Sequence, residues 1–319
     1  GNHTQTGLVG CCSIDDYFNN KIKKHELTRP DKEEDRKNHV RYSALNYEAV
    51  FLSYPQVTDI DQLVNITKKE SHLYDFISDD DIRHRLWAIT NKEILQKIAS
   101  LFRTKVPKIY IADGHHRTAA GALVGKELRD SRNGNLDDKK RDNYFMAVVF
   151  PDNQLKILDY NRVVKDFNGF TKNELIQGLK NKFDVVTCAT QYRPENLHTF
   201  GMYLEGQWYK LWSLPDSYDD SDPLGQLDVT ILSKNVLEPI FNIIDLRKDP
   251  RIDFVGGMRG LDELEKRVDS GEMKVAFSMY PVSMTQLINI SDNDLLMPPK
   301  VTWFEPKLRS GLFIHDLSD

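Results

Sequence analysis

Five consecutive residues, Asp113-Gly114-His115-His116-Arg117, place a carboxylate, two imidazoles and a guanidinium in one short run. Histidine can donate a hydrogen bond, move a proton near neutral pH or bind a metal. Arginine offers a planar fork of donors to a phosphate or a carboxylate, and an aspartate can orient a histidine or hold a cation. The first hypothesis is therefore a site that binds an anion and moves a proton.

The elements around this run must position it. The apolar stretch 109–112 is typical of a strand, and the Asp-Gly pair after it is typical of a sharp turn. Residues 118–128 are rich in Ala and Leu, which predicts a helix beginning near His115 or His116. The first turn of a helix has unpaired N–H groups and a partial positive charge, so it is a natural seat for an anion. The alternatives are plain turn chemistry, or a metal site, for which adjacent histidines lack the i, i+4 spacing of a helical zinc pair.

A second polar group is Lys24-His25-Glu26, where a base, an acid and a cation lie together. Glu26 is a candidate general base or cation ligand, and His25 and His116 are the other candidate catalytic residues. A charge-rich helix is predicted to begin after Thr28, with Pro30 in its first turn and one solvated face. For Glu26, an exposed loop carboxylate without a function is the alternative.

The third stretch is residues 297–312, near the end of the chain. Its prolines at 298, 299 and 306 fix an extended path that presents charged side chains. Lys300 and Lys307 are candidate anion ligands on this rigid strip. The alternative is a packed tail that Trp303 and Phe304 anchor.

Composition limits the function classes. The 319 residues include no apolar run near the length of a membrane span and no stretch that reads as a secretory leader, so a cytoplasmic location is expected. The formal net charge of −5 argues against broad nucleic-acid binding. Because the first residues already read as a strand, the natural chain is expected to start further upstream.

The pattern of elements predicts a mixed α/β (α+β) protein. We expect residues 1–164 to hold the central motif and residues 165–319 to form a second α+β lobe, with the 297–312 strip returning to a site in the cleft between them. Two hairpins are predicted, one pairing 144–150 with 155–160 and one pairing 200–204 with 207–212 around Glu205-Gly206. Arg162, at the end of a predicted strand, is expected at the surface.

Three motifs in order carry a resemblance to a known family: KKHELT at 23–28, IADGHHRTAA at 111–120 and MPPKVTWFEPKLRSG at 297–311. Together they resemble the family named domain of unknown function 1015 (DUF1015), although many members have Ser where this chain has Val301. Through the Asp-Gly-His-His-Arg segment, that family is similar to the ParB/sulfiredoxin superfamily. This resemblance implies a ParB/sulfiredoxin-like α/β domain that binds nucleotides or polyphosphates.

Some members of that superfamily are kinases of free L-serine, so the resemblance implies Mg²⁺-dependent phosphoryl transfer to a small hydroxyl compound from ATP, ADP or pyrophosphate. Glu26 is then the candidate base, Asp113 holds Mg²⁺ or orients a histidine, and His115, His116 and Arg117 cradle the phosphates. One alternative is a nucleotide- or phosphate-binding regulatory protein without catalysis. Another is a metal-dependent hydrolase that uses His25, His115 and His116. The donor, the acceptor and the oligomeric state stay open.

Overall fold

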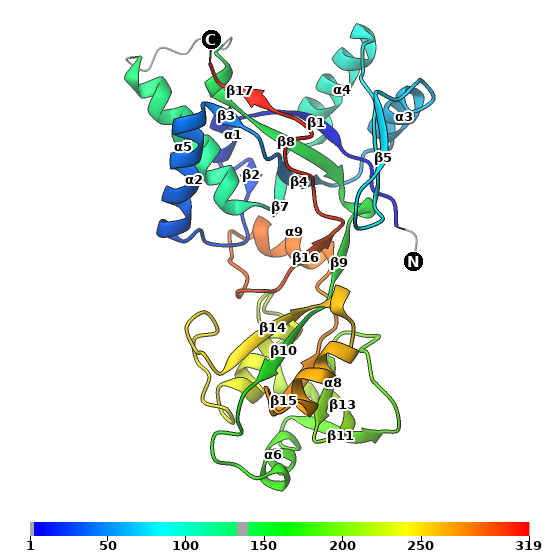
Figure 1. Ribbon diagram of the computed structural model, residues 1–319, viewed down its shortest axis with the longest axis vertical. Coiled ribbons are helices and arrows are strands. Elements are labelled where there is room, and N and C mark those ends of the chain that lie inside the picture. The colour runs from blue at the N-terminus through cyan, green and yellow to red at the C-terminus, as the bar shows by residue number, and fades with distance from the viewer. Residues whose placement is uncertain (1–2, 133–139, 319) are drawn as a thin grey trace. The chain divides into compact units, whose positions relative to one another are not determined.

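The chain is described by a computed structural model over residues 3–132 and 140–318, and it divides into two units, each of mixed α/β structure (Figure 1). The predicted mixed α/β fold is confirmed. The first unit comprises Gly1–Leu155 with Pro306–Asp319, and the second comprises Lys156–Glu305. The sequence suggests a boundary at residue 164, whereas this division falls nine residues earlier (164 − 155) and assigns the last segment to the first unit.

The first unit is built on a five-stranded sheet with the strand order β1-β8-β4-β7-β2. Strand β4 is buried along its whole length because it lies in the middle of the sheet. Two short antiparallel pairs, β3 with β17 and β5 with β6, accompany this sheet. The strands are β1 Leu8–Ser13, β2 Ile22–Lys23, β3 Leu45–Asn46, β4 Val50–Tyr54, β5 Tyr74–Ile77, β6 Arg83–Leu86, β7 Ile109–Asp113, β8 Tyr144–Pro151 and β17 His315–Asp316.

The helices of the first unit pack on this sheet around one apolar cluster. Its buried members include Ile14, Leu52, Ile60 and Ala122, which come from three helices and the central strand. Helices α2 and α5 lie side by side (Figure 1). The helices are α1 Ile14–Phe18, α2 Pro30–Ser43, α3 Thr58–Thr67, α4 Lys92–Lys105 and α5 His115–Ser131, with short 3-10 turns at Arg141–Asn143 and Asp152–Gln154.

Helix α5 is buried through small residues, which explains the unusual composition of 118–125. Thr118, the alanines and both glycines of this stretch are buried. A Cβ on Gly121 would lie 2.9 Å from Cβ of Phe145, and a Cβ on Gly125 would collide with the backbone oxygen of Asp142. Small side chains therefore let α5 approach the rest of the unit closely.

The substitution Gly125→Ala is expected to destabilise the protein by about 2 kcal/mol or more, because the backbone at Asp142 cannot yield as a flexible side chain would. Gly178→Ala is the matched control. Gly178 also lies within a helix, but a Cβ there meets only Ile240 at an ordinary 3.5 Å, so it should stabilise by roughly 0.5–1 kcal/mol. Urea unfolding of both variants checks the opposite signs, and equal effects would contradict the packing argument.

The second unit is built on a six-stranded antiparallel sheet with the order β11-β13-β12-β15-β10-β14. A further pair, β9 with β16, joins the two ends of this unit. The elements are β9 Lys156–Leu158, β10 Tyr160–Val164, α6 Lys172–Leu179, β11 Phe183–Cys188, β12 Thr199–Leu204, β13 Gln207–Ser213, α7 Asp228–Leu232, β14 Ile252–Gly256, α8 Asp262–Asp269, β15 Val275–Ser278, α9 Met284–Asp292 and β16 Trp303–Glu305.

One predicted hairpin is confirmed and the other is wrong. Strands β12 and β13 pair with Leu204 opposite Gln207, and both turn residues, Glu205 and Gly206, have positive φ as such a turn requires. The strand at 144–151, in contrast, pairs with β1 and β4, while β9 pairs with β16. Two apolar strands with a short connection suggested a hairpin, but each of them pairs with strands that are distant in the sequence.

No helix within the described residues is long and apolar enough to cross a membrane.

Candidate active site

The two polar motifs meet because their strands are neighbours. Strands β2 and β7 pair in parallel, with Lys23 opposite Tyr110, so both chains leave the sheet at the same edge. Residues 24–26 follow β2, and residues 114–117 follow β7. This register brings together His25 and His115, which are 90 positions apart in the sequence and whose rings are in contact.

The turn between β7 and α5 depends on Gly114. This residue has φ 91° and directly precedes the helix, and a Cβ there would lie 2.9 Å from Nε and Nη2 of Arg117. The left-handed backbone therefore favours glycine, and any side chain at this position would displace the guanidinium that folds over it. The helix begins at His115, as the sequence predicts.

The first turn of α5 is open to an anion. Its hydrogen-bond ladder starts with the N–H of Thr118 on the carbonyl of Gly114, so the N–H groups of residues 115–117 have no helical acceptor. Within the described part of the chain, no side chain caps this helix, and its first turn holds no acidic residue. No acidic residue of the helix itself therefore offsets the partial positive charge of its first turn, and the nearby carboxylates come from outside the helix.

Arg117 links this turn to the sheet. Its Nη2 lies 3.2 Å from Oδ2 of Asp113, and its Nη1 donates to the carbonyl of Ala49 at 3.2 Å and lies 3.6 Å from Oε2 of Glu48. The side chain is 25% exposed, so these contacts hold the fork in place while part of it still faces solvent. A phosphate at this position would meet a preoriented guanidinium.

His115 is buried, only 6% exposed, and it faces Glu26. Burial, helped by the nearby His25, His116 and Lys24, holds the pKa of His115 well below its usual value, so the ring is neutral at pH 7. Its Nε2 faces the N–H of His25 at 3.5 Å, which leaves the ring proton on Nδ1, and Nδ1 lies 4.0 Å from Oε2 of Glu26. His115 thus presents an N–H toward a carboxylate that is 42% exposed.

His116 has a different role from its neighbour. Its Nε2 accepts a hydrogen bond from the N–H of Arg29 at 2.9 Å, so the proton of the neutral ring is on Nδ1. The side chain is only partly buried, and Nδ1–H is available as a donor. Two adjacent histidines therefore point to different partners, as neighbouring helix positions must.

His25 lies beneath this surface. It is 2% exposed, and its ring meets that of His115 edge to face, with centroids 4.4 Å apart. Burial lowers the pKa of His25 to about 4, although Asp113 and the carbonyl of Ile111 oppose the shift. Its Nδ1 is buried and has no hydrogen-bond partner among the described residues. This geometry suits a positioning residue that supports His115 better than a group that contacts substrate.

The depressed pKa of His25 makes stability dependent on pH. The unfolded chain takes up the proton near pH 6.5, whereas the folded protein does so only near 4, so stability falls as the pH drops through this window, by on the order of 3 kcal/mol. Urea unfolding at about pH 7.5 and about pH 4.5 should show a smaller loss in His25→Gln than in the native protein. The control His72→Gln removes an exposed histidine and should keep the native pH dependence. An unchanged pH dependence in His25→Gln would contradict the assignment.

Asp113 and Lys307 come together at this edge of the first unit. Nζ of Lys307 lies 3.7 Å from Oδ1 of Asp113, while Oδ2 of that carboxylate faces Arg117. The last part of the 297–312 strip therefore reaches the central motif. Elsewhere on this part of the strip, Arg309 binds Asp80 and Ser78, which fixes its path. Within residues 3–132 and 140–318, no group of three or more His, Cys, Asp or Glu side chains is arranged to hold a metal ion, so the proposed metal role of Asp113 stays a prediction.

Lys300, the other lysine predicted on the strip, belongs to the second unit. Its carbonyl accepts a hydrogen bond from Nη2 of Arg162 at 3.0 Å, and its Nζ lies 5.8 Å from the centroid of the Tyr160 ring. Its role as a ligand of the same anion stays a prediction. The expectation of a surface Arg162 is wrong, because this side chain is 1% exposed.

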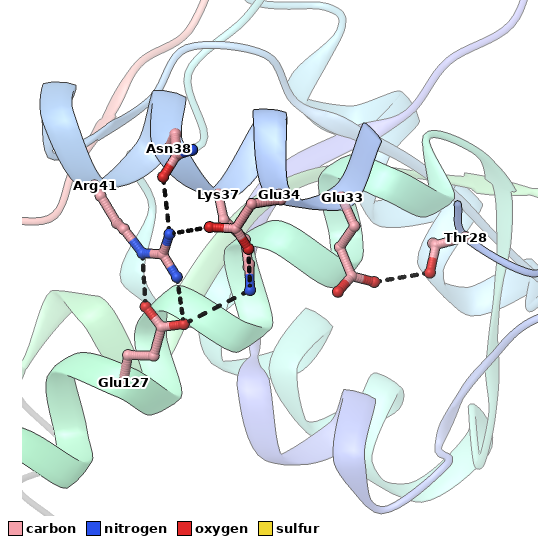
Figure 2. Close-up of polar contacts among 7 residues, drawn as sticks. All are labelled: Thr28, Glu33, Glu34, Lys37, Asn38, Arg41 and Glu127. Atoms are coloured by element: carbon pink, nitrogen blue, oxygen red, sulfur yellow. Dashed lines mark hydrogen bonds and ion pairs between the residues drawn. The ribbon is translucent and has the colours of Figure 1, made fainter. Parts of the chain in front are cut away.

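Helix α2 is fixed against α5 by a network of charged side chains, shown in Figure 2. The guanidinium of Arg41 donates to both carboxylate oxygens of Glu127, at 2.7 and 2.8 Å, and to Glu34 at 2.6 Å. At the other end of α2, Thr28 donates to Glu33 at 2.7 Å, which orders the segment that carries Glu26 (Figure 2). The charge-rich helix therefore has a solvated face and also holds the segment around Glu26 against α5.

A pocket beside Arg117 was not expected from the sequence. It is a small pocket of about 30 Å³, partly open to solvent, between α2, α5 and the strands. Its polar lining residues are Arg36, His39, Asn46, Tyr47, Glu48 and Arg117, and apolar side chains make up the rest. Oδ1 of Asn46 is buried without a hydrogen-bond partner among the described residues. The i, i+3 spacing of Arg36 and His39 shows that they share a helix face, but not that a pocket adjoins it.

Comparison with solved structures gives weak similarities over most of the chain. A free serine kinase variant in complex with AMP is 12% identical with a TM-score of 0.44, covering 95% of this chain and 88% of that one. A conserved hypothetical protein from Pyrococcus furiosus is 14% identical with a TM-score of 0.41, covering 97% and 94%. SbnI from Staphylococcus aureus with a C-terminal truncation is 11% identical with a TM-score of 0.45, covering 95% and 85%.

No curated protein matches the sequence. The family described as "Protein of unknown function (DUF1015)" matches residues 1–230, which include both motifs of the candidate site. This match covers well over half of the chain, so the resemblance that the three motifs suggest is confirmed. The protein belongs to the DUF1015 family.

Proposed function

We propose that this protein transfers a phosphoryl group from a nucleotide or pyrophosphate to a small hydroxyl metabolite, such as free L-serine. The observation that carries the proposal is the meeting of two features at one edge of the sheet. One is the uncapped first turn of α5 with Arg117, and the other is the partly exposed carboxylate of Glu26 beside the neutral His115. An anion seat next to a candidate base is what phosphoryl transfer to a hydroxyl group requires.

The phosphate groups of the donor would bind to the N–H groups of the first turn, to Nδ1–H of His116 and to Arg117. Lys307 lies close enough to Asp113 to add a further positive charge, and Lys300 is a proposed ligand as well. Such transfer needs little covalent participation by the protein, since positioning and charge neutralisation lower most of the barrier.

Glu26 would take the proton of the acceptor hydroxyl. His115 is a positioning residue in this scheme, because its Nδ1–H faces the carboxylate and burial keeps its ring neutral. His25 packs against that ring and holds it in place. His115 and His25 would therefore orient Glu26 from the protein interior, while the carboxylate of Glu26 stays accessible to solvent.

Asp113 is the proposed Mg²⁺ ligand. Magnesium in such sites uses one or two carboxylates together with substrate phosphates, so a single aspartate beside the anion seat fits this mode. Bound there, the ion would neutralise phosphate charge. The loose 3.7 Å contact of Lys307 with Oδ1 leaves that oxygen able to exchange its partner when a donor binds.

The donor, whether ATP, ADP or pyrophosphate, would place its phosphates beside the small pocket that Arg117 lines. A cytoplasmic location, where such donors occur, stays a prediction.

The test is phosphorus NMR of the protein with Mg²⁺, L-serine and, in turn, ATP, ADP and pyrophosphate. We expect a new phosphomonoester signal with one donor, which identifies that donor at once. Broadening of donor signals without any product from L-serine or other hydroxyl compounds would instead favour a nucleotide- or phosphate-binding protein without catalysis. Absence of both effects would overturn the proposal.

A further inference from the structure

A single arginine anchors the last part of the 297–312 strip to the hairpin of β5 and β6. Nη2 of Arg309 donates to Oγ of Ser78 at 2.9 Å and makes an ion pair with Asp80. Nε of Arg309 donates to Nε2 of His84 at 3.2 Å. His84 lies on β6, and the other two partners lie in the turn between β5 and β6. Three acceptors on one hairpin therefore fix the guanidinium in one orientation.

The neighbours of Arg309 on the strip reach two carboxylates beside the candidate active site. Nζ of Lys307 lies 3.7 Å from Oδ1 of Asp113. Oγ of Ser310 donates to Oε1 of Glu48 at 3.2 Å. The strip thus contacts one oxygen of each carboxylate, and both contacts lie within three residues of the anchored arginine.

The other oxygen of each carboxylate faces Arg117. Nη2 of Arg117 lies 3.2 Å from Oδ2 of Asp113, and its Nη1 lies 3.6 Å from Oε2 of Glu48. A fully formed charge-assisted hydrogen bond between such groups measures about 2.7–2.9 Å. Both contacts are longer than this, so the two carboxylates orient the guanidinium without using its full capacity to bind an anion.

We propose that Arg309 is a positioning residue for the anion seat at the first turn of α5, although it does not touch the anion. By fixing the strip, it lets Lys307 and Ser310 hold the two carboxylates partly away from Arg117. The guanidinium then stays available to a phosphate. This inference rests on the proposed function, because it concerns how the same site keeps its arginine free of competing carboxylates.

The experiment is calorimetric titration of the full chain with pyrophosphate. Arg309→Met should raise the dissociation constant roughly fivefold to tenfold, because the released carboxylates move onto Arg117 and compete with the anion. Arg309→Lys keeps the charge opposite Asp80 but not the fork, so it should lie between the two. The backbone N–H of Gly311 donates to the carbonyl of Tyr47 at 2.9 Å, so the strip should stay attached in both variants.

The matched control is Arg83→Met. Arg83 belongs to the same hairpin and donates to both carboxylate oxygens of Asp75, at 2.7 and 2.6 Å. Its loss removes an equally well-bonded arginine but leaves the three partners of Arg309 in place. The affinity for pyrophosphate should therefore stay within about twofold of the native value, as expected for sites without shared partners.

Glu48→Gln separates positioning from a general disturbance of structure, because it removes the negative charge of one competing carboxylate. The resulting gain in pyrophosphate affinity should be at least about threefold larger in Arg309→Met than in the native protein. A general disturbance would make the two gains equal. If unfolding curves show that Arg309→Met does not fold, Asp80→Asn takes its place, since it removes only the ion-pair partner of Arg309.

Failure of this inference can be told apart from failure of the proposed function. A native protein that binds no pyrophosphate would overturn the anion seat and the inference together. Native binding that Arg309→Met leaves within twofold would overturn the positioning role alone. An equal loss in Arg83→Met, or equal gains from Glu48→Gln in both backgrounds, would do the same and leave the seat intact.

Discussion

The substitution Glu26→Gln is expected to lower the rate of phosphoryl transfer by about 10²–10⁴-fold, the usual contribution of a general base. Glutamine keeps the shape of the side chain but cannot accept the proton of the acceptor hydroxyl. Because Glu26 is 42% exposed and makes only a distant contact with His115, the fold and the binding of the donor should be nearly unchanged. The initial rate of phosphomonoester formation, followed by phosphorus NMR, measures the effect.

The control is Glu70→Gln, which removes an exposed carboxylate of the same unit and should keep the native rate. Titration of the donor separates the two possible roles of Glu26. A base affects kcat and leaves the dissociation constant of the donor within about twofold, whereas a cation ligand raises that constant. A variant that keeps more than a tenth of the native rate would exclude Glu26 as the base.

The second large effect is expected from Arg117→Met, which removes the fork that lies over Gly114. Two charge-assisted hydrogen bonds to phosphate are each worth about 1.5–3 kcal/mol, so the dissociation constant of the donor should rise by at least about 100-fold. Arg117→Lys keeps the charge but not the fork and should lie between the native protein and the methionine variant. Line-broadening of donor signals in phosphorus NMR, or calorimetry, provides the measurement.

Arg103→Met is the control for the loss of a surface arginine, since Arg103 lies exposed on α4. Arg117 also contacts Asp113 and Glu48, so its loss can disturb the site as well as the ligand. Unfolding curves of both lysine and methionine variants detect such a disturbance. Unchanged donor affinity in a folded Arg117→Met protein would remove the first turn of α5 from the phosphate site.

Local turns and helix starts could be predicted from the order of the residues. Asp-Gly after an apolar strand predicted the turn and the helix that begins at His115, because glycine alone tolerates the backbone that the turn needs. The same reasoning predicted the Glu205-Gly206 hairpin. Three separated motifs were also enough to indicate the DUF1015 family, which the match over residues 1–230 confirms.

Pairing between strands that are distant in the sequence could not be predicted in this way. The parallel register of β2 with β7 places Glu26 beside His115, and no residue near either strand encodes that partner. For the same reason the strand at 144–151 found β1 and β4 and did not form the predicted hairpin. The burial of Arg162 could not be predicted from the sequence either. A charged side chain is expected at the surface unless the distant residues that surround it are known. Sequence fixes what each residue can do chemically, while contacts between distant segments decide which residues act together.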